Sequence, residues 1–215
     1  MTKSSIETGG ALDAILLTLF TAELSYHHLP HVAHEICGLM LTAMILVHVW
    51  LNRRRLMSLT KKISPRKIFS LTINFLLTIC AALTISAGVC VSNHLFAVSA
   101  QLHRNIAIHQ AHVATPYVMM ILLGVHVGLH WSELRGRLIH LTGEKIFRAS
   151  VVMLAAIGLA GLAMNRVVDR ILLEHIFATP ATELNGAIFA LMTVGGIIFF
   201  ALITFLADKK IFGRR

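Results

Sequence analysis

Six apolar segments follow one another along the chain, and clusters of charged residues separate them. They cover residues 11–24, 32–51, 68–91, 106–129, 149–164 and 186–207. A helix that crosses the hydrocarbon layer of a bilayer needs about 20 predominantly apolar residues, and most of these segments have that length. The first segment, which Asp13 and Glu23 bracket, and the short fifth segment fit least well. The pattern predicts an all-α protein, a polytopic transmembrane helical bundle with six spans.

The composition supports a membrane protein. Of the 215 residues, 56% are hydrophobic and 13% are charged, and the mean hydropathy is +0.76. Soluble domains of this length are less apolar and carry more charge. The first segment lacks a strongly basic start and a clear small-residue cleavage site, so we expect a retained span there and not a secretory signal. Cys37, Cys80 and Cys90 lack metal-ligand spacing and are expected to be packing residues.

The basic residues predict the orientation of the chain. All but three of the 19 Lys and Arg residues fall before the first segment, between the second and third, between the fourth and fifth, or after the sixth; the exceptions are Arg104, Arg166 and Arg170. By the positive-inside rule, the linkers that carry the basic residues face the cytoplasm, and so do both termini. Topology and anionic lipid therefore account for the net charge of +9, and no nucleic-acid partner is expected.

Two histidine pairs share one spacing on two different segments. His34 and His48 are fourteen residues apart in the second segment, and so are His112 and His126 in the fourth. At about 3.5 residues per turn, this interval is a whole number of turns, so both members of a pair face one seam. They lie about 21 Å apart along the helix axis. Because both segments run from outside to inside, we expect His34 to match His112 near the outer face and His48 to match His126 near the inner face.

This arrangement favours two haems, one near each face, each held by imidazoles from both helices. The chain has no Cys-x-x-Cys-His string, so the haems would be non-covalent, b-type groups. With 13 histidines some such intervals arise by chance, and a membrane histidine can simply hydrogen-bond a neighbouring helix. Ligation is the stronger hypothesis because ionisable groups inside a bilayer are costly. Gly38, Gly124 and Gly128 would let a porphyrin or a helix backbone approach closely.

Other polar residues near the predicted haems have candidate roles. His130 lies one turn after His126 and is expected to contact a propionate or a quinone, or to reach the interface. Arg104 precedes the fourth segment and is expected to meet a propionate of the outer haem. Further histidines near the outer face are loop residues that could also bind a transition metal or relay protons at a quinol site; they are His27, His28, His31, His94, His103, His109 and His175.

Three short strings resemble the small bacterial flavinylation-associated cytochrome family, long catalogued as a domain of unknown function. They are HEICG at 34–38, VHVWLNR at 47–53 and GVHVGLHW at 124–131. The resemblance covers the first two thirds of the chain. It implies that 1–131 is a four-helix, di-haem core similar to cytochrome b and ferric reductases. In this core the haem ligands are His34, His48, His112 and His126.

The resemblance also implies a setting and a role. Proteins of this kind lie in the bacterial inner membrane and are thought to pass electrons to flavin-carrying extracytoplasmic partners. Residues 132–148 would be a cytoplasmic loop. Residues 149–215, two additional transmembrane helices and a basic cytoplasmic tail, go beyond the short family pattern, so the resemblance gives them no role.

The sequence therefore predicts transmembrane electron transfer through two b-type haems, as an electron-transfer subunit of an oxidoreductase. The donor would be a quinol pool or a cytoplasmic donor, and the acceptor would be extracytoplasmic. An alternative is a ferric or cupric reductase that uses the outer histidines. A haem-free, histidine-rich metal transporter is a third reading, but it predicts polar groups in mid-membrane, which are scarce; Asn74 and Thr78 are examples. No nucleotide-binding or nucleophile motif is present.

Overall fold

The computed structural model describes residues 3–59, 64–96, 100–174 and 183–213. Within these ranges the chain is helical, with short turns between the helices and no strand. The elements are α1 (Lys3–Leu24), η1 (Tyr26–His28), α2 (His31–Leu59), α3 (Pro65–Val91), α4 (Ala100–His103), α5 (Ile106–Leu129), α6 (Trp131–Thr142), α7 (Glu144–Met164), α8 (Val167–Ile171) and α9 (Gly186–Phe212).

Among the described residues, five helices are long and apolar enough to cross a membrane. They are α2 over His31–Arg54, α3, α5, α7 and α9. This confirms the predicted all-α, polytopic transmembrane bundle. Helix α1 forms where the first segment was predicted, but it is not among these five; it carries Asp13 and Glu23.

The fifth span is longer than its apolar segment indicated. Helix α7 begins at Glu144 and has 21 residues, which at about 1.5 Å per residue is enough to cross the hydrocarbon layer. Most of the predicted loop at 132–148 is likewise helical: α6 occupies its first part, and Gly143, with a φ of 78°, is the turn into α7. Glycine suits this turn because residues with a Cβ rarely adopt a positive φ.

Polar residues set where two of the central helices begin. The Ser64 hydroxyl accepts a hydrogen bond from the Lys67 amide, and Pro65 occupies the first turn of α3. The Asn105 side chain accepts from the amides of Ala107 and Ile108 at the start of α5. These side chains satisfy amides that have no partner inside the helix, and proline is tolerated in a first turn.

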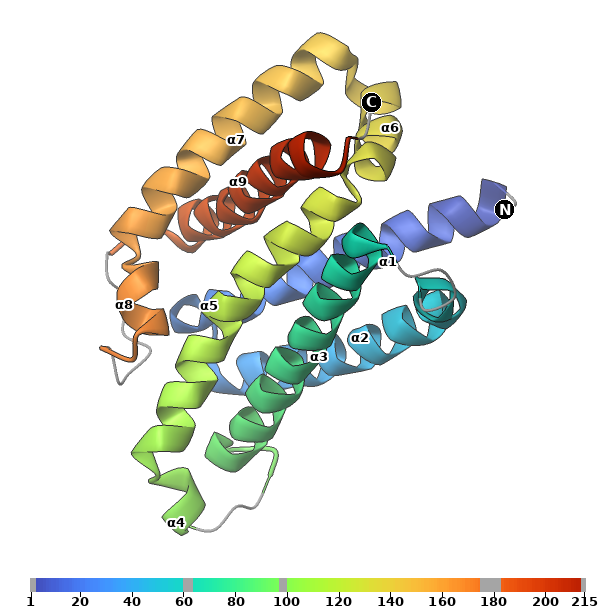
Figure 1. The fold of residues 1–215 in the computed structure, drawn as a ribbon. Coiled ribbons are helices and arrows are strands. Elements are labelled where there is room, and N and C mark those ends of the chain that lie inside the picture. The colour runs from blue at the N-terminus through green and yellow to red at the C-terminus, as the bar shows by residue number, and fades with distance from the viewer. Residues whose placement is uncertain (1–2, 60–63, 97–99, 175–182, 214–215) are drawn as a thin grey trace.

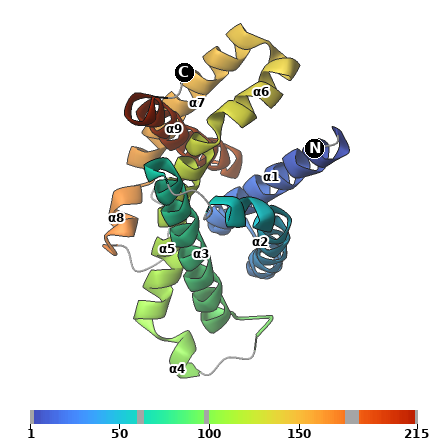
Figure 2. The same cartoon turned by 45° about the vertical axis from the view of Figure 1, so that its right-hand side comes forward.

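Helix α5 lies at the centre of the molecule, packed against α3 on one side and α9 on the other, and α7 covers α9 (Figure 1). Helix α2 packs mainly on α1 and more lightly on α3. Figure 2 shows α1 and α2 side by side, on the far side of α3 from α7. The apolar core follows α5, where Tyr117 and Met120 pack with Phe20 of α1 and with Phe189 and Ile197 of α9.

Glycines bring α5 and α9 into close contact. A Cβ at Gly124 would lie 2.6 Å from the Cβ of Phe200, and a Cβ at Gly128 would lie 2.5 Å from the backbone oxygen of Ala201. Of the two approaches expected for these glycines, the structure therefore shows the approach of a helix backbone. Helix α9 thus packs directly against α5, the helix that carries His112 and His126.

Candidate functional site

The two histidines of α2 face carboxyl groups of α1. The Nδ1 atom of His34 lies 3.1 Å from Oε2 of Glu23, and that of His48 lies 3.3 Å from Oδ1 of Asp13. Because α2 follows α1 as an antiparallel partner, the end of α1 meets the start of α2 and the middle of α1 meets the middle of α2. Each of the two imidazoles therefore has an acidic neighbour on its Nδ1 side.

These contacts are close but are not aligned as hydrogen bonds. The Nδ1 atoms of His34 and His48 and the Oε1 atom of Glu23 are buried and make no hydrogen bond among the described residues. Buried polar atoms of this kind are rare in native proteins and mark strained or functional positions. Two of these three atoms belong to His34 and His48, which are among the four histidines identified by their spacing in the sequence.

The two histidines of α5 face neutral oxygens of α3. The Nδ1 atom of His112 lies 3.1 Å from the backbone oxygen of Thr84, and that of His126 lies 2.8 Å from Oδ1 of Asn74. A carbonyl oxygen only accepts, so Nδ1 carries the hydrogen and donates it. All four histidines thus direct Nδ1 toward an oxygen on a neighbouring helix.

This arrangement suits metal ligation. When Nδ1 of a neutral imidazole carries the hydrogen, Nε2 holds the lone pair that binds a metal. Histidines that ligate metals almost always donate the other ring N–H to a carboxylate, a backbone carbonyl or another acceptor, which fixes the ring. The structure places the carboxyl groups of Glu23 and Asp13, the carbonyl of Thr84 and the amide oxygen of Asn74 beside the four Nδ1 atoms.

His34 of α2 and His112 of α5 lie side by side. Their ring centroids lie 6.0 Å apart, and the rings are nearly perpendicular, with an interplanar angle of 77°. Two imidazoles that share one metal ion, at about 2 Å from each nitrogen, have a similar separation. Gly88 of α3 sets the position of the second ring, since a Cβ there would lie 2.9 Å from Cε1 of His112.

The rings of His48 and His126 have different neighbours. The Nδ1 side of the His48 ring lies beside Asp13, and that of the His126 ring lies beside Asn74. The His126 ring also lies 5.1 Å from that of His130. No residue in the most apolar stretch of α2 is buried inside the protein.

The remaining predicted contacts lie at the ends of α5. His130 connects α5 to α6, and its Nδ1 atom lies 3.8 Å from Oε1 of Glu133. Its place beside His126 is compatible with the predicted cofactor contact. Arg104 is exposed and immediately precedes Asn105, the residue that caps α5, at the end of the helix nearer His112. His175, one of the outer histidines, lies outside the described residues.

A polar cluster of Tyr26, His31, Glu35 and His94 lies beside His34. The Tyr26 hydroxyl lies 2.6 Å from Nδ1 of His31, and its ring meets that of His34 edge-on at 4.8 Å. Burial, followed by the charge of Glu35, raises the pKa of Tyr26, so its hydroxyl stays protonated. The rings of His31 and His94 are stacked at 6.4 Å.

Glu35 organises the turn after α3. Its carboxylate accepts hydrogen bonds from the Ser92 hydroxyl and from the backbone amides of Asn93, His94 and Leu95, at 2.8 to 3.2 Å. This acidic residue thus ties α2 to the end of α3, one position after His34.

The oxygens that lie beside the four Nδ1 atoms were not expected from the sequence. Asp13 and Glu23 were noted only because they weaken the first segment, and Asn74 only as a polar residue in the third. A signal was present: Asp13 and Glu23 are ten residues apart, in the helix that precedes one histidine pair. Asn74, the acceptor for His126, likewise lies in the long helix that precedes the other pair.

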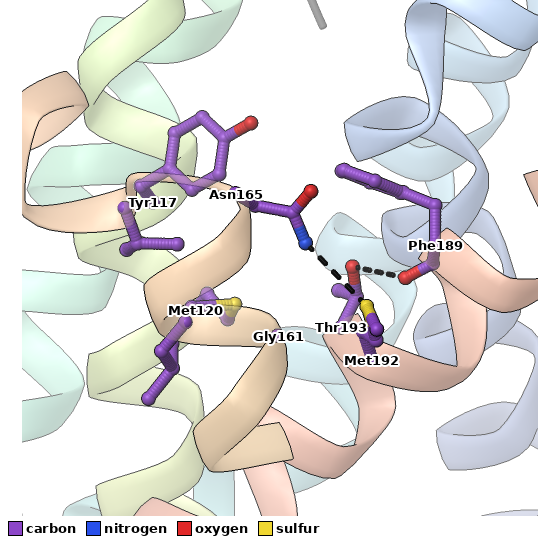
Figure 3. Close-up of a pocket in the computed structure, with 9 residues that line it drawn as sticks. Tyr117, Met120, Gly161, Asn165, Phe189, Met192 and Thr193 are labelled. Carbon is purple, nitrogen blue, oxygen red and sulfur yellow. Dashed lines mark hydrogen bonds between the residues drawn. The ribbon is translucent and has the colours of Figure 1, made fainter. Parts of the chain in front are cut away.

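One small cavity has none of these four histidines in its lining. It lies where α5, α7, α8 and α9 meet, between Tyr117, Asn165 and Thr193 (Figure 3). The Asn165 amide donates to Sδ of Met192 at 3.8 Å. The space is about that of one water molecule, so it cannot hold a cofactor.

Among the described residues, no group of three or more His, Cys, Asp or Glu side chains forms a metal site. Haem iron needs only two axial side chains, so this finding applies to sites built entirely from protein ligands. No protein-family model, curated protein or solved structure matches this chain.

Proposed function

We propose that this chain carries electrons across a membrane through two b-type haems, one held by His34 and His112 and the other by His48 and His126. Bound haem supplies one-electron chemistry, in which iron alternates between the ferric and ferrous states. The observation that carries the proposal is the shared setting of the four imidazoles, each with an oxygen on its Nδ1 side. The 6.0 Å separation of the His34 and His112 rings supports the first pair.

The residues present fit the group. The buried Nδ1 atoms of His34 and His48 lie beside carboxyl oxygens without a completed hydrogen bond. A ligated imidazole has a more acidic N–H, which favours such a bond. No residue in the most apolar stretch of α2 is fully buried by the described helices, which leaves part of its surface available to an apolar macrocycle or to lipid.

Two haem levels separated by fourteen residues would let an electron enter near one face of the membrane and leave near the other. The donor would be a quinol or a cytoplasmic protein. The acceptor would be an extracytoplasmic partner, such as a flavin-carrying protein of the kind that the family resemblance implies. The role of the chain is to hold the groups, set their potentials and exclude water.

We place the His48 end of the bundle toward the cytoplasm of a bacterial inner membrane. Arg66 at the start of α3 pairs with Asp208 near the end of α9, and Arg137 of α6 lies 3.7 Å from Asp13 of α1. The basic linkers therefore gather at one end of the molecule, as the positive-inside rule requires. A reporter that is active only in the cytoplasm, fused after Arg215, should be active.

The direct test is an optical spectrum of the detergent-purified chain, oxidised and then reduced, with haem counted per chain. We expect two haems. His34→Leu or His112→Leu should remove one, and His48→Leu or His126→Leu should remove the other. His140→Leu, a change at an exposed histidine of α6, is the control and should leave both. Less than one haem per chain after haem-replete expression would contradict the proposal and favour the haem-free metal transporter.

A second candidate function is reduction of ferric or cupric ions at the His34 end. The observation that favours it is the pair of stacked, exposed rings of His31 and His94 beside Tyr26, which itself contacts His34. Each electron that leaves the nearby haem would reduce one Fe(III) to Fe(II) or one Cu(II) to Cu(I). Replacing both histidines with alanine should slow reduction of these ions while haem content stays at the wild-type level.

A further inference from the structure

The two helices that supply the histidines differ in what lies behind the imidazoles. Both histidines of α2 face carboxyl groups, and both histidines of α5 face neutral oxygens. Since each proposed haem takes one ligand from each helix, each would have one imidazole with an acidic neighbour and one with a neutral neighbour. We propose that Glu23 and Asp13 are positioning residues that hold the α2 imidazoles and lower the midpoint potentials of the two haems, one each.

The packing around Glu23 shows a site built for its carboxyl group. A Cβ at Gly38 would lie 3.3 Å from Oε2 of Glu23, so glycine leaves room for the acidic group next to His34. The side chain of Glu23 is 16% exposed and that of His34 is 17% exposed, which makes the contact largely shielded from water. Electrostatic interactions are stronger where water is excluded.

Asp13 interacts with His48 more weakly than Glu23 interacts with His34. Its Oδ1 atom lies 3.3 Å from Nδ1 of His48, while its Oδ2 atom lies 3.7 Å from Nη1 of Arg137. The side chain is 54% exposed. A neighbouring cation and solvent both reduce the effect of the carboxylate on the imidazole. Glu23 should therefore influence its haem more than Asp13 influences the other.

The chemical consequence concerns the two oxidation states of iron. A carboxylate that accepts the Nδ1 hydrogen makes the imidazole a stronger donor, and this stabilises ferric iron more than ferrous iron. At a pH at which the carboxyl group is ionised, replacing the acid with the amide removes the negative charge and keeps an acceptor oxygen, which should raise the midpoint potential. Glu23→Gln and Asp13→Asn make this change with little change in volume.

The experiment is a potentiometric titration of the purified wild-type and variant proteins in detergent, followed by haem absorbance. We expect two reduction steps in the wild type. Glu23→Gln should raise the potential of one step and Asp13→Asn that of the other, with the larger shift for Glu23→Gln. The low-spin ferric signal in electron paramagnetic resonance should change for the same haem in each variant. Two haems per chain should remain.

Glu35→Gln is a matched control that distinguishes the effect of direct contact with the His34 ring from the effect of a nearby charge. Glu35 lies one residue after His34, and its carboxylate bonds the turn at Ser92 and Leu95 and not the His34 ring. Glu35→Gln removes the same charge at the same end of the bundle, so it should shift the potential less than Glu23→Gln. If Glu35→Gln shifted the potential as much as Glu23→Gln, the proposed role of Glu23 through contact with His34 would be overturned. Glu23→Asp, which keeps the charge, should lie closer to the wild type than Glu23→Gln.

The inference rests on the proposed function, and the two can fail separately. A wild-type protein without haem contradicts the function itself. Two haems with unchanged potentials in Glu23→Gln and Asp13→Asn, or a shift of the same step in both, would overturn the positioning role and leave the function standing. Loss of one haem, a different one in each variant, would support the role. Loss of both haems in either variant would overturn it, because the carboxyl group would then hold the helix pair as a whole.

Discussion

At the scale of single residues, Gly88 determines where the His112 ring can lie. A Cβ at this position would come within 2.9 Å of Cε1 of His112, so the ring would have to move. We expect Gly88→Ala to weaken haem binding at the His34 and His112 pair by about 10- to 100-fold, the usual effect of disturbing a group that orients a metal ligand. Haem titration of the apoprotein measures this. Gly136→Ala, where nothing lies within 4 Å, is the control and should bind like the wild type.

Asn74 has the corresponding role for His126. Its Oδ1 atom lies 2.8 Å from Nδ1 of this histidine, and leucine at this position would remove the acceptor. We expect Asn74→Leu to weaken binding of the haem at the His48 and His126 pair by about 10- to 100-fold and to leave the other haem in place. Thr78→Val is the comparison, since the Thr78 hydroxyl donates only to the backbone oxygen of Asn74, at 2.9 Å. Equal haem content in both variants would contradict the role of Asn74.

At the scale of elements, the histidine helices and the five apolar spans were predictable, but the orientation of the rings was not. Spacing shows which residues share a helix face, and hydropathy shows which helices lie in lipid. The acceptor for His112 is the backbone oxygen of Thr84, so no side chain in the sequence could indicate it. Asp13 and Glu23 carry charges that count against a membrane span, and only the pairing of α1 with α2 shows that they face histidines.

The contact between α7 and α9 could not be read from hydropathy either, because glycines carry it. A Cβ at Gly158 would lie 2.0 Å from the carbonyl carbon of Gly195. We expect Gly158→Leu to lower the free energy of unfolding by about 1–3 kcal/mol or more, since overpacking forces the helices apart. Thermal unfolding in detergent measures the loss. Ala160→Leu places the same side chain on an exposed position of α7 and should change stability little; equal losses would show that the crossing tolerates larger residues.

At the scale of the whole molecule, Arg66 ties together three helices at the end that carries the basic linkers. Its Nε donates to Oδ1 of Asp208 in α9, and its Nη2 donates to the backbone oxygen of Leu129 at the end of α5, both at 2.7 Å. The sequence identified Arg66 only as part of a basic cluster, because a count of charges indicates a side of the membrane and not a partner. The Asp208 side chain is 7% exposed and that of Arg66 is 24% exposed, so the pair is mostly shielded from water.

Breaking this pair should cost more than breaking an exposed one. Asp208→Asn leaves the Arg66 cation without its anion, and we expect the free energy of unfolding to fall by about 1–3 kcal/mol. Arg148→Met, which breaks the exposed pair with Glu144 in α7, should cost less than about 1 kcal/mol. The double variant Arg66→Met with Asp208→Leu should lose less than the sum of the single variants, because it removes both charges at once. Effects that add to within about 0.5 kcal/mol would mean that apolar packing of α5 against α9 holds this end by itself.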